Sequence, residues 1–500
     1  MIPQTIKDTI MKKSTIHILA LVVTTVLLSS CGKGFLDVTP TNSVSAPTSV
    51  RTAADAKVMV TGMMRNLLSS NYYGRNFFMY GDAKGGDLTL YSQGRGLDAL
   101  YTFNHTANTN NYGGFWSTIY NNILQANSLL ANIEKLKNEG STENFDVYKG
   151  QALTLRALMY FDLVRIYGKP YTYDKSSYGV PNVTTPLEAS AQPLRATVEE
   201  NYNQIIKDLT DAAPLLPKAK NNGFINYYAN RAIQARVYLT MGNYSQALAA
   251  AEDVIQNGGY SLYTPADWVA SWKTQFGSES IFELAVLPTE ADLGTASLGF
   301  YLRRKGHGST SALGFFGASD YFLARLNEDP TDVRWGIMAA DELSTSSNPR
   351  LGSCYKYSGS TDLAGDGKST STAVNIKVIR LSEMYLIAAE AALPTDKTKA
   401  ASYLNEIRKR APALPAATSG TITLDMILDE KSKELFAEGQ RYFDMLRLNK
   451  SITFNDEILG ITIPTRPKTI DRTFEKTILP IPIGEINANP AIGQQQNSGY

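Results

Sequence analysis

The chain has 500 residues, and its 48 Lys and Arg against 47 Asp and Glu give a formal net charge of +1 at pH 7. A chain this close to neutral has no electrostatic attraction to nucleic acid or to anionic lipid, so neither is an expected partner. Its 43% hydrophobic and 19% charged residues exclude a disordered chain and a polytopic membrane protein.

The chain has few of the residues that bind metals or act in nucleophilic catalysis. Two cysteines and three histidines are too few for a disulfide framework or a His/Cys zinc site, and they leave little material for a Ser/His/Asp triad. The sequence GDGK at residues 365–368 lacks the ligand spacing of an EF-hand calcium loop. We therefore expect no cofactor and no metal.

The first thirty residues have the features of a secretory signal peptide. Lys12 and Lys13 precede a mostly apolar stretch at residues 16–28, which is shorter than the roughly 20 residues that a membrane span needs. We expect residues 1–30 to be removed.

The end of this segment, Leu28-Ser29-Ser30-Cys31, resembles the lipobox of bacterial lipoproteins. Cleavage there would leave Cys31 at the new terminus for lipidation, and residues 31–50, rich in Ser, Thr and Pro, would form a tether. The alternative is an ordinary signal peptide followed by an incidental cysteine. The lipid interpretation places the protein on a membrane surface, facing an extracytoplasmic space, with only Cys354 left in the rest of the chain.

Beyond residue 51, apolar residues recur at spacings of three and four, which predicts amphipathic helices. At the start of one of them, Thr197 and Glu200 have the spacing of a capping box. The expected helices cover residues 116–137, 147–167, 197–213, 227–256 as a pair, 377–393, 397–411 and 424–449.

The pair at residues 227–256 is the most specific of these patterns. Its turn, Gly242-Asn243-Tyr244-Ser245-Gln246-Ala247-Leu248, resembles a tetratricopeptide repeat, in which Gly ends one helix and small residues let two helices approach closely. Residues 377–393 and 397–411 are expected to form a second pair.

Two long regions lack helical periodicity. Residues 70–115 and 260–375 are rich in Gly, Ser, Asn and aromatic residues, and structureless stretches of this length are usually functional or poorly ordered. Ser280–Val286 and residues 478–483 are the expected strands. The predicted fold is mainly α: a tetratricopeptide-like helical-repeat scaffold over residues 51–500, with large irregular, loop-rich insertions and a few short strands.

Two late motifs point to a family. One is EKSKELFAEGQRYFDMLR at residues 430–447, and the other is LPIPIGEINANP at residues 479–490. Together with the start at Cys31 and RLSEMYL at residues 380–386, they closely resemble the SusD/RagB family of the Bacteroidetes. The resemblance covers nearly the whole chain after the signal peptide.

The resemblance implies a fold and a function. Such proteins are surface-exposed, lipid-anchored proteins of the outer membrane with tetratricopeptide helices. Each caps a SusC-like TonB-dependent transporter and helps to capture oligosaccharide or polysaccharide, or in some members peptide, for import. They are not enzymes. The resemblance therefore implies a nutrient-binding lipoprotein whose repeat side faces the transporter and whose loop-rich side faces the nutrient.

Two other classes of function remain as alternatives. A lipid-anchored glycan hydrolase would need two carboxylates about 5–10 Å apart in a cleft. The acidic and basic residues of the motif at residues 430–447 alternate instead, at spacings that suit ion pairs along one helix face. A repeat-type adaptor that binds only protein would leave the aromatic loops unexplained.

Carbohydrate binding needs flat apolar faces for sugar rings and polar side chains for their hydroxyls. The loop-rich regions supply both kinds of side chain, and core packing is the competing interpretation for each ring. Tyr72 and Tyr91 are the leading candidates, whereas Trp116 and Trp335 are expected in the core. The full set of candidates is Tyr72, Tyr73, Asp82, Tyr91, Arg95, Trp268, Trp272 and Tyr301.

Overall fold

The computed structural model describes residues 50–94, 97–287, 289, 293–307, 311–358, 372–460 and 462–500. The expected signal peptide, Cys31 with its tether up to residue 49, Arg95 and the loop at residues 365–368 lie outside these described residues. The described part of Thr52–Tyr500 belongs to one compact unit.

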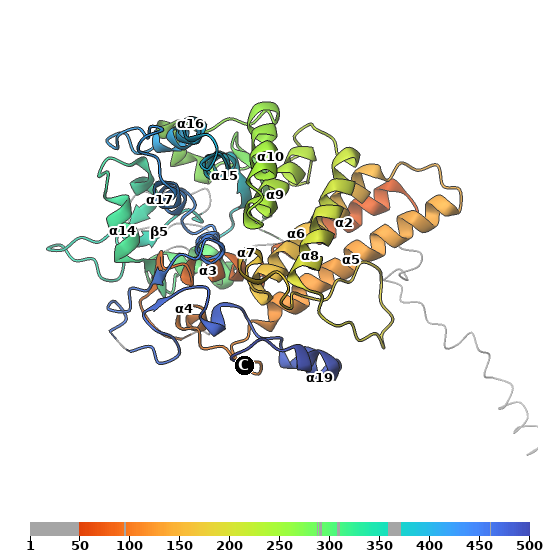
Figure 1. Cartoon of the computed structure of the whole chain (residues 1–500). Coiled ribbons are helices and arrows are strands. Elements are labelled where there is room, and N and C mark those ends of the chain that lie inside the picture. The colour runs from red at the N-terminus through yellow and green to blue at the C-terminus, as the bar shows by residue number, and fades with distance from the viewer. Residues whose placement is uncertain are drawn as a thin grey trace, which may run out of the picture. The chain divides into compact units, whose positions relative to one another are not determined.

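A row of long helices forms the scaffold, and each packs against the next one (Figure 1). The row consists of α2 (Ala53–Leu67), α5 (Gly113–Asn138), α6 (Asp146–Tyr167), α8 (Val198–Ala212), α9 (Tyr227–Thr240), α10 (Tyr244–Asn257), α15 (Leu381–Ala392) and α16 (Lys397–Arg408). Neighbour-to-neighbour packing of this kind is typical of helical-repeat proteins. The predicted helical-repeat scaffold is confirmed.

Local sequence explains where these helices begin and end. At the start of α8, the Thr197 amide donates to Glu200 Oε2 at 2.7 Å and the Glu200 amide donates to Thr197 Oγ1 at 3.2 Å, which is the predicted capping box. Between α9 and α10, Gly242 has a φ of +75°, which favours glycine. Asn243 then caps α10 by accepting a hydrogen bond from the Gln246 amide.

The chain leaves the helical row after α10 and returns to it at α15. These two helices pack directly against each other although residues 258–380 separate them. The elements in the described residues of this stretch are short: α11 (Pro265–Trp268), η4 (Ala270–Lys273), β2 (Ser280–Leu284), η5 (Gly294–Ala296), α13 (Leu298–Leu302), β3 (Phe316–Ala318), α14 (Asp320–Leu326), η6 (Val333–Ile337), β4 (Met338–Ala339), β5 (Ser353–Cys354) and β6 (Ile376–Arg380).

The first loop-rich region also contains short elements, and a strand pair joins it to the insertion. Its elements are α3 (Asn76–Ala83), β1 (Leu88–Leu90) and α4 (Asp98–Thr102). β1 pairs antiparallel with β3, with Leu88 opposite Ala318, so two regions more than 200 residues apart are hydrogen-bonded to each other. β2 pairs with β6, which brings the beginning and the end of the insertion together.

The remaining short elements lie in the linkers and near the C-terminus. They are α7 (Tyr171–Asp174), η3 (Ala213–Leu215), α17 (Leu424–Glu434), α18 (Arg441–Arg447), β7 (Ile452–Thr453), β8 (Thr469–Ile470), η7 (Glu475–Thr477), α19 (Ile483–Ala488) and η8 (Pro490–Gln495). β4 pairs with β5, and β7 pairs with β8, each antiparallel.

Three predicted elements need correction. The helix predicted over residues 377–393 begins at Leu381, because residues 376–380 form β6. The helix predicted over residues 424–449 is two helices, α17 and α18, which are separated by Ala437 and Gly439 in the left-handed region at φ +64° and +76°. The strand predicted at residues 478–483 is absent: residues 478–482 belong to no strand, and α19 begins at Ile483.

The family motif at residues 430–447 supplies a buried cluster of charges. Glu434 accepts hydrogen bonds from Arg380 at 3.0 Å and lies in an ion pair with Arg410, and all three side chains are at most 4% exposed. Glu438 pairs with Arg380 at 2.7 Å and with Lys356 at 2.8 Å. The motif therefore stabilises the fold both by pairing with distant elements and by pairing along its own helices, where Arg447 pairs with Asp444 at 2.6 Å and Lys433 with Glu430 at 3.5 Å.

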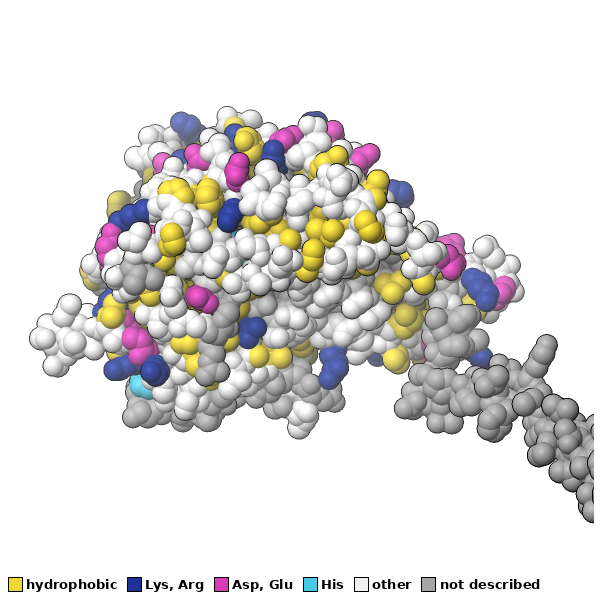
Figure 2. Space-filling view, turned by 90° about the horizontal axis from the view of Figure 1, so that it is seen from below, with side chains coloured by type: hydrophobic (Ala, Val, Ile, Leu, Met, Phe, Trp, Pro, Cys, Tyr) yellow, Lys and Arg dark blue, Asp and Glu magenta, His cyan; other side chains and the backbone are white. Residues whose placement is uncertain are grey.

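The surface seen in Figure 2 has no field of a single charge sign: Lys and Arg side chains are interspersed with Asp and Glu among many uncharged groups. This agrees with the near-zero net charge. None of the helices in the described part of the chain is long and apolar enough to cross a membrane.

Candidate ligand-binding surface

The structure places Tyr72 and Tyr73 in the core, not on a ligand surface. Both rings are 0% exposed and stack with their centroids 4.3 Å apart. Their hydroxyls donate hydrogen bonds to the same oxygen, Asp162 Oδ2 on α6, at 2.5 and 2.6 Å. Burial raises the pKa of both phenols, so they remain neutral donors. The expectation that these tyrosines present faces to a sugar is corrected.

Asp82, Trp268 and Trp272 are also buried. Asp82 Oδ2 accepts a hydrogen bond from the Gly439 amide at 2.7 Å, which secures the turn between α17 and α18. The two indoles meet edge to face at 5.9 Å, and Trp272 packs beside the Lys356 ammonium at 4.5 Å. These three residues cover the buried charge cluster, and this position corrects the expectation that they contact a ligand.

Tyr301 lies at the edge of the core and begins a cluster of partly exposed side chains. Its ring is 5% exposed, Arg75 stacks over it at 4.9 Å, and Phe315 approaches it edge to face at 6.4 Å. Arg75, Phe315 and the nearby Tyr112 are half-buried, so part of each faces solvent. We call Arg75, Tyr112, Tyr301 and Phe315 the Tyr301 cluster.

Tyr91 connects this cluster to a second polar group. Its amide donates to the Phe315 carbonyl at 2.7 Å, and its half-buried ring carries a hydroxyl that donates to Asp341 Oδ2 at 2.7 Å. Arg350 Nη1 donates to the Tyr91 hydroxyl at 2.5 Å and pairs with Asp341 and Asp320. Burial raises the pKa of Tyr91, so the phenol stays protonated. Tyr91 is thus the one described candidate with a ring that is only half-buried.

Arg350 also borders a hollow of about 610 Å³, which we call the Trp335 hollow. Trp335 is half-buried there, whereas Trp116 is 5% exposed, so the expectation of a core position is right for Trp116 and wrong for Trp335. Sequence periodicity could not indicate that Trp335 is partly exposed, because this residue lies in a short 3-10 helix. The lining consists of Leu323, Ala324, Asn327, Pro330, Trp335, Pro349, Arg350 and Leu351.

The chemistry of this surface suits binding. Rings and prolines offer apolar faces, and Asn327 offers hydrogen bonds, as carbohydrate recognition requires. Arg350 and the Tyr91 hydroxyl already bond each other and Asp341, which fixes the Tyr91 ring in place. Its carboxylates, Asp320 and Asp341, are both occupied by Arg350. In the described residues no group of three or more His, Cys, Asp and Glu side chains is arranged to hold a metal ion.

Two protein families match the chain. One, described as starch-binding and associating with the outer membrane, matches residues 34–239, and the other, described as the SusD family, matches residues 235–500. The chain belongs to the SusD family. This confirms the resemblance found in the sequence motifs.

Other SusD-family members align over nearly all of the chain. A SusD-like protein of Bacteroides ovatus is 26% identical over 462 residues, which is 86% of this chain and 82% of that protein. A SusD superfamily structure from Bacteroides thetaiotaomicron has a TM-score of 0.80 and 34% identity, covering 89% of this chain and 100% of the other. A putative sugar binding protein from Bacteroides vulgatus has a TM-score of 0.80 and 32% identity, covering 91% and 100%.

Proposed function

We propose that this SusD-family protein is a surface lipoprotein of the outer membrane that binds oligosaccharide or polysaccharide and delivers it to a SusC-like TonB-dependent transporter. The observation that carries the proposal is the continuous series of half-buried rings and polar groups from Tyr112 through Phe315 and Tyr91 to Trp335. Two loop-rich regions that are distant in sequence form it together. Starch or sugar binding in the descriptions of a matching family and a relative supports a glycan as the ligand.

The half-buried state of these rings suits a sugar. A ring that is held by neighbours on one side loses little conformational freedom when a ligand covers its other side. Phe315 is held by Tyr301, and Tyr91 is held by Arg350 and Asp341. Each therefore presents a pre-positioned apolar face, with hydrogen-bonding groups beside it.

Anchoring and partner follow from the proposed role. Lipidation at Cys31 would hold the protein to the membrane through residues 31–50, without a membrane-spanning helix. The part of the helical row away from α2 and α5 would offer an extended surface to the transporter. The protein would bind and hand over its ligand without catalysis, as the family resemblance implies.

The test uses unlipidated protein from residue 32 in native gels that contain soluble starch, laminarin, xylan, mannan or polygalacturonate, with parallel assays for released reducing ends. We expect retardation by at least one polymer and no release. Phe315→Ala should weaken that retardation about 10-fold through loss of an aromatic face. Gln246→Ala, an exposed substitution on α10, should leave it unchanged.

Two outcomes would contradict the proposal. Release of reducing ends would show a hydrolase. Absence of retardation by every polymer, also when the partner transporter is present, would favour a peptide over a glycan as the ligand.

A further inference from the structure

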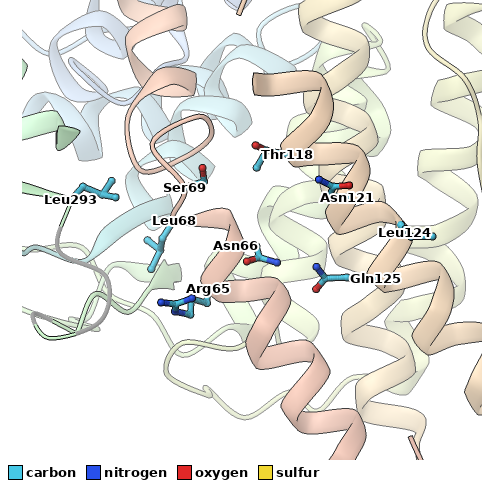
Figure 3. A pocket seen from close by; sticks show the side chains of 9 residues that line it. All are labelled: Arg65, Asn66, Leu68, Ser69, Thr118, Asn121, Leu124, Gln125 and Leu293. Carbon is cyan, nitrogen blue, oxygen red and sulfur yellow. The ribbon is translucent and has the colours of Figure 1, made fainter. Parts of the chain in front are cut away.

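A second hollow of about 530 Å³ lies between the C-terminal end of α2 and the N-terminal half of α5 (Figure 3). Thr118, Asn121 and Gln125 follow one another at spacings of three and four, so they share one face of α5. They face Asn66 and Ser69 at the end of α2, as Figure 3 shows. We call this the α2–α5 hollow. None of its residues was among the candidates found in the sequence.

The α5 wall of this hollow is uncharged over an unusual length. Residues 113–133 contain no Asp, Glu, Lys or Arg, although Ser117, Asn121 and Leu124 in this stretch are exposed, Leu124 by 47%. The solvent-facing side of a surface helix normally carries charged residues. A neutral, amide-rich face is therefore a feature that solubility alone does not explain.

The hollow adjoins the Tyr301 cluster. Leu293 lines the hollow and also lies against Gly74, where an added Cβ would come within 2.6 Å of Leu293 Cδ1. Gly74 directly precedes Arg75, which stacks on Tyr301. Ser69 and Leu293 of the hollow thus lie beside Gly74, next to the residue that stacks on Tyr301.

We propose that the α2–α5 hollow is a subsite for further sugar units of the same glycan chain that contacts the Tyr301 cluster. This rests on the proposed function. Asn, Gln, Ser and Thr side chains both donate and accept hydrogen bonds, as sugar hydroxyls do, whereas Leu68, Leu124 and Leu293 give small apolar contacts. The hollow holds no aromatic ring, so its units bind weakly alone and add affinity only to a chain already held by the cluster.

The size of the hollow limits how much of a glycan it can take. A volume of about 530 Å³ is within the range of small-ligand sites and leaves room for a few sugar units at most. Its lining is mostly amides, hydroxyls and leucines, with one charged side chain, the exposed Arg65. The subsite therefore favours long glycans over short ones.

The test compares Asn121→Ala/Gln125→Ala with wild-type protein in the same five-polymer gels, followed by titration with maltooligosaccharides and β-1,3-glucan oligosaccharides of two to eight units. Both substitutions put a better helix former on an exposed helix face, so the variant should fold normally. For a polymer that wild-type protein binds, we expect the double variant to raise Kd about 5- to 30-fold, since two hydrogen-bonding side chains are lost. Affinity for the shortest oligosaccharides should not change. Gln246→Ala is the matched control.

The outcomes separate this inference from the function on which it rests. If wild-type protein binds a polymer but the double variant binds it equally well, or if the loss is the same for two units as for eight, the subsite is refuted and the proposed function stands. Absence of retardation by all five polymers, also when the partner transporter is present, overturns both.

Discussion

Arg380 and Glu438 form a two-point ion pair in the core: Nε donates to Oε2 at 2.9 Å and Nη2 donates to Oε1 at 2.7 Å, although 58 residues separate them in sequence. Lys356 adds a third hydrogen bond to the same carboxylate at 2.8 Å. One carboxylate therefore pairs with two buried cations. Its removal takes away the carboxylate that pairs with Lys356 and one of the three that pair with Arg380, so part of the desolvation of both cations is no longer compensated.

Glu438→Gln should lower the free energy of unfolding by about 3–5 kcal/mol, the usual cost of breaking a buried ion pair. Urea denaturation followed by far-UV circular dichroism measures it. Glu406→Gln is the control, because its pair with Lys409 is exposed and should contribute little. A loss equal to that of the control would show that the buried pair does not stabilise the fold.

Acid should destabilise the protein through the same cluster. Burial alone would raise the pKa of Glu438, but Arg380 and Lys356 outweigh it and hold the pKa below its ordinary value. Arg410, Arg380 and Arg334 do the same for Glu434. A carboxyl whose pKa is lower in the folded state contributes stability above its unfolded pKa of about 4.3, and this contribution is lost as the pH falls.

We therefore expect the Tm to hold between pH 7 and about pH 5 and to fall steeply below about pH 4.5. Asp82 and Asp208 act in the opposite sense, since burial raises the pKa of each, but they are two groups against several. Thermal unfolding at pH 7 to 3 measures the profile. A Tm that is unchanged at pH 3 would contradict it.

Gly81→Ala should prevent normal folding. A Cβ on Gly81 would lie 2.0 Å from the carbonyl oxygen of Gly439, which is backbone and cannot rotate away. Gly62→Ala is the matched change, because nothing lies within 4 Å of its Cβ position on α2. It should stabilise the protein by about 0.5–1 kcal/mol through helix propensity. Soluble yield and Tm measure both, and a Gly81→Ala protein as stable as wild type would refute the close approach.

Tyr72→Phe should cost stability and leave glycan binding unchanged. It removes one of two phenol donors from Asp162, so we expect a loss of about 1–3 kcal/mol, as for a hydrogen bond to a charged group. Denaturation and gel retardation are measured on the same preparation. If fully folded Tyr72→Phe protein is retarded less than wild-type protein, Tyr72 contributes to ligand binding and this prediction is wrong.

Trp335 should report ligand binding by fluorescence. The other three tryptophans are at most 5% exposed, whereas Trp335 is half-buried in the hollow beside Arg350. Titration with a polymer that retards the protein should change the emission, and Trp335→Phe should abolish the change. An unchanged response in Trp335→Phe would place the ligand away from this hollow.

The sequence by itself determined the scaffold, because helices depend on local information. Apolar spacing of three and four identified α5, α6 and α8, and the turn at Gly242-Asn243 marked the repeat. Capping at Thr197 depends only on residues three apart. The family motifs at residues 430–447 and 479–490 are continuous in the chain, so the family could also be recognised from the sequence.

Only the tertiary structure decided which aromatic side chains face solvent. Tyr72 and Phe315 are both aromatic residues in loop-rich regions, and the sequence does not tell which of them is exposed. Tyr72 is buried and bonds Asp162, which is 90 residues away, whereas Phe315 keeps part of its side chain exposed. The break between α17 and α18 has the same origin: the helical pattern continues through it, but Gly439 must approach Gly81, and Glu438 must reach Arg380. Burial and backbone breaks of this kind depend on contacts between distant residues, which periodicity does not encode.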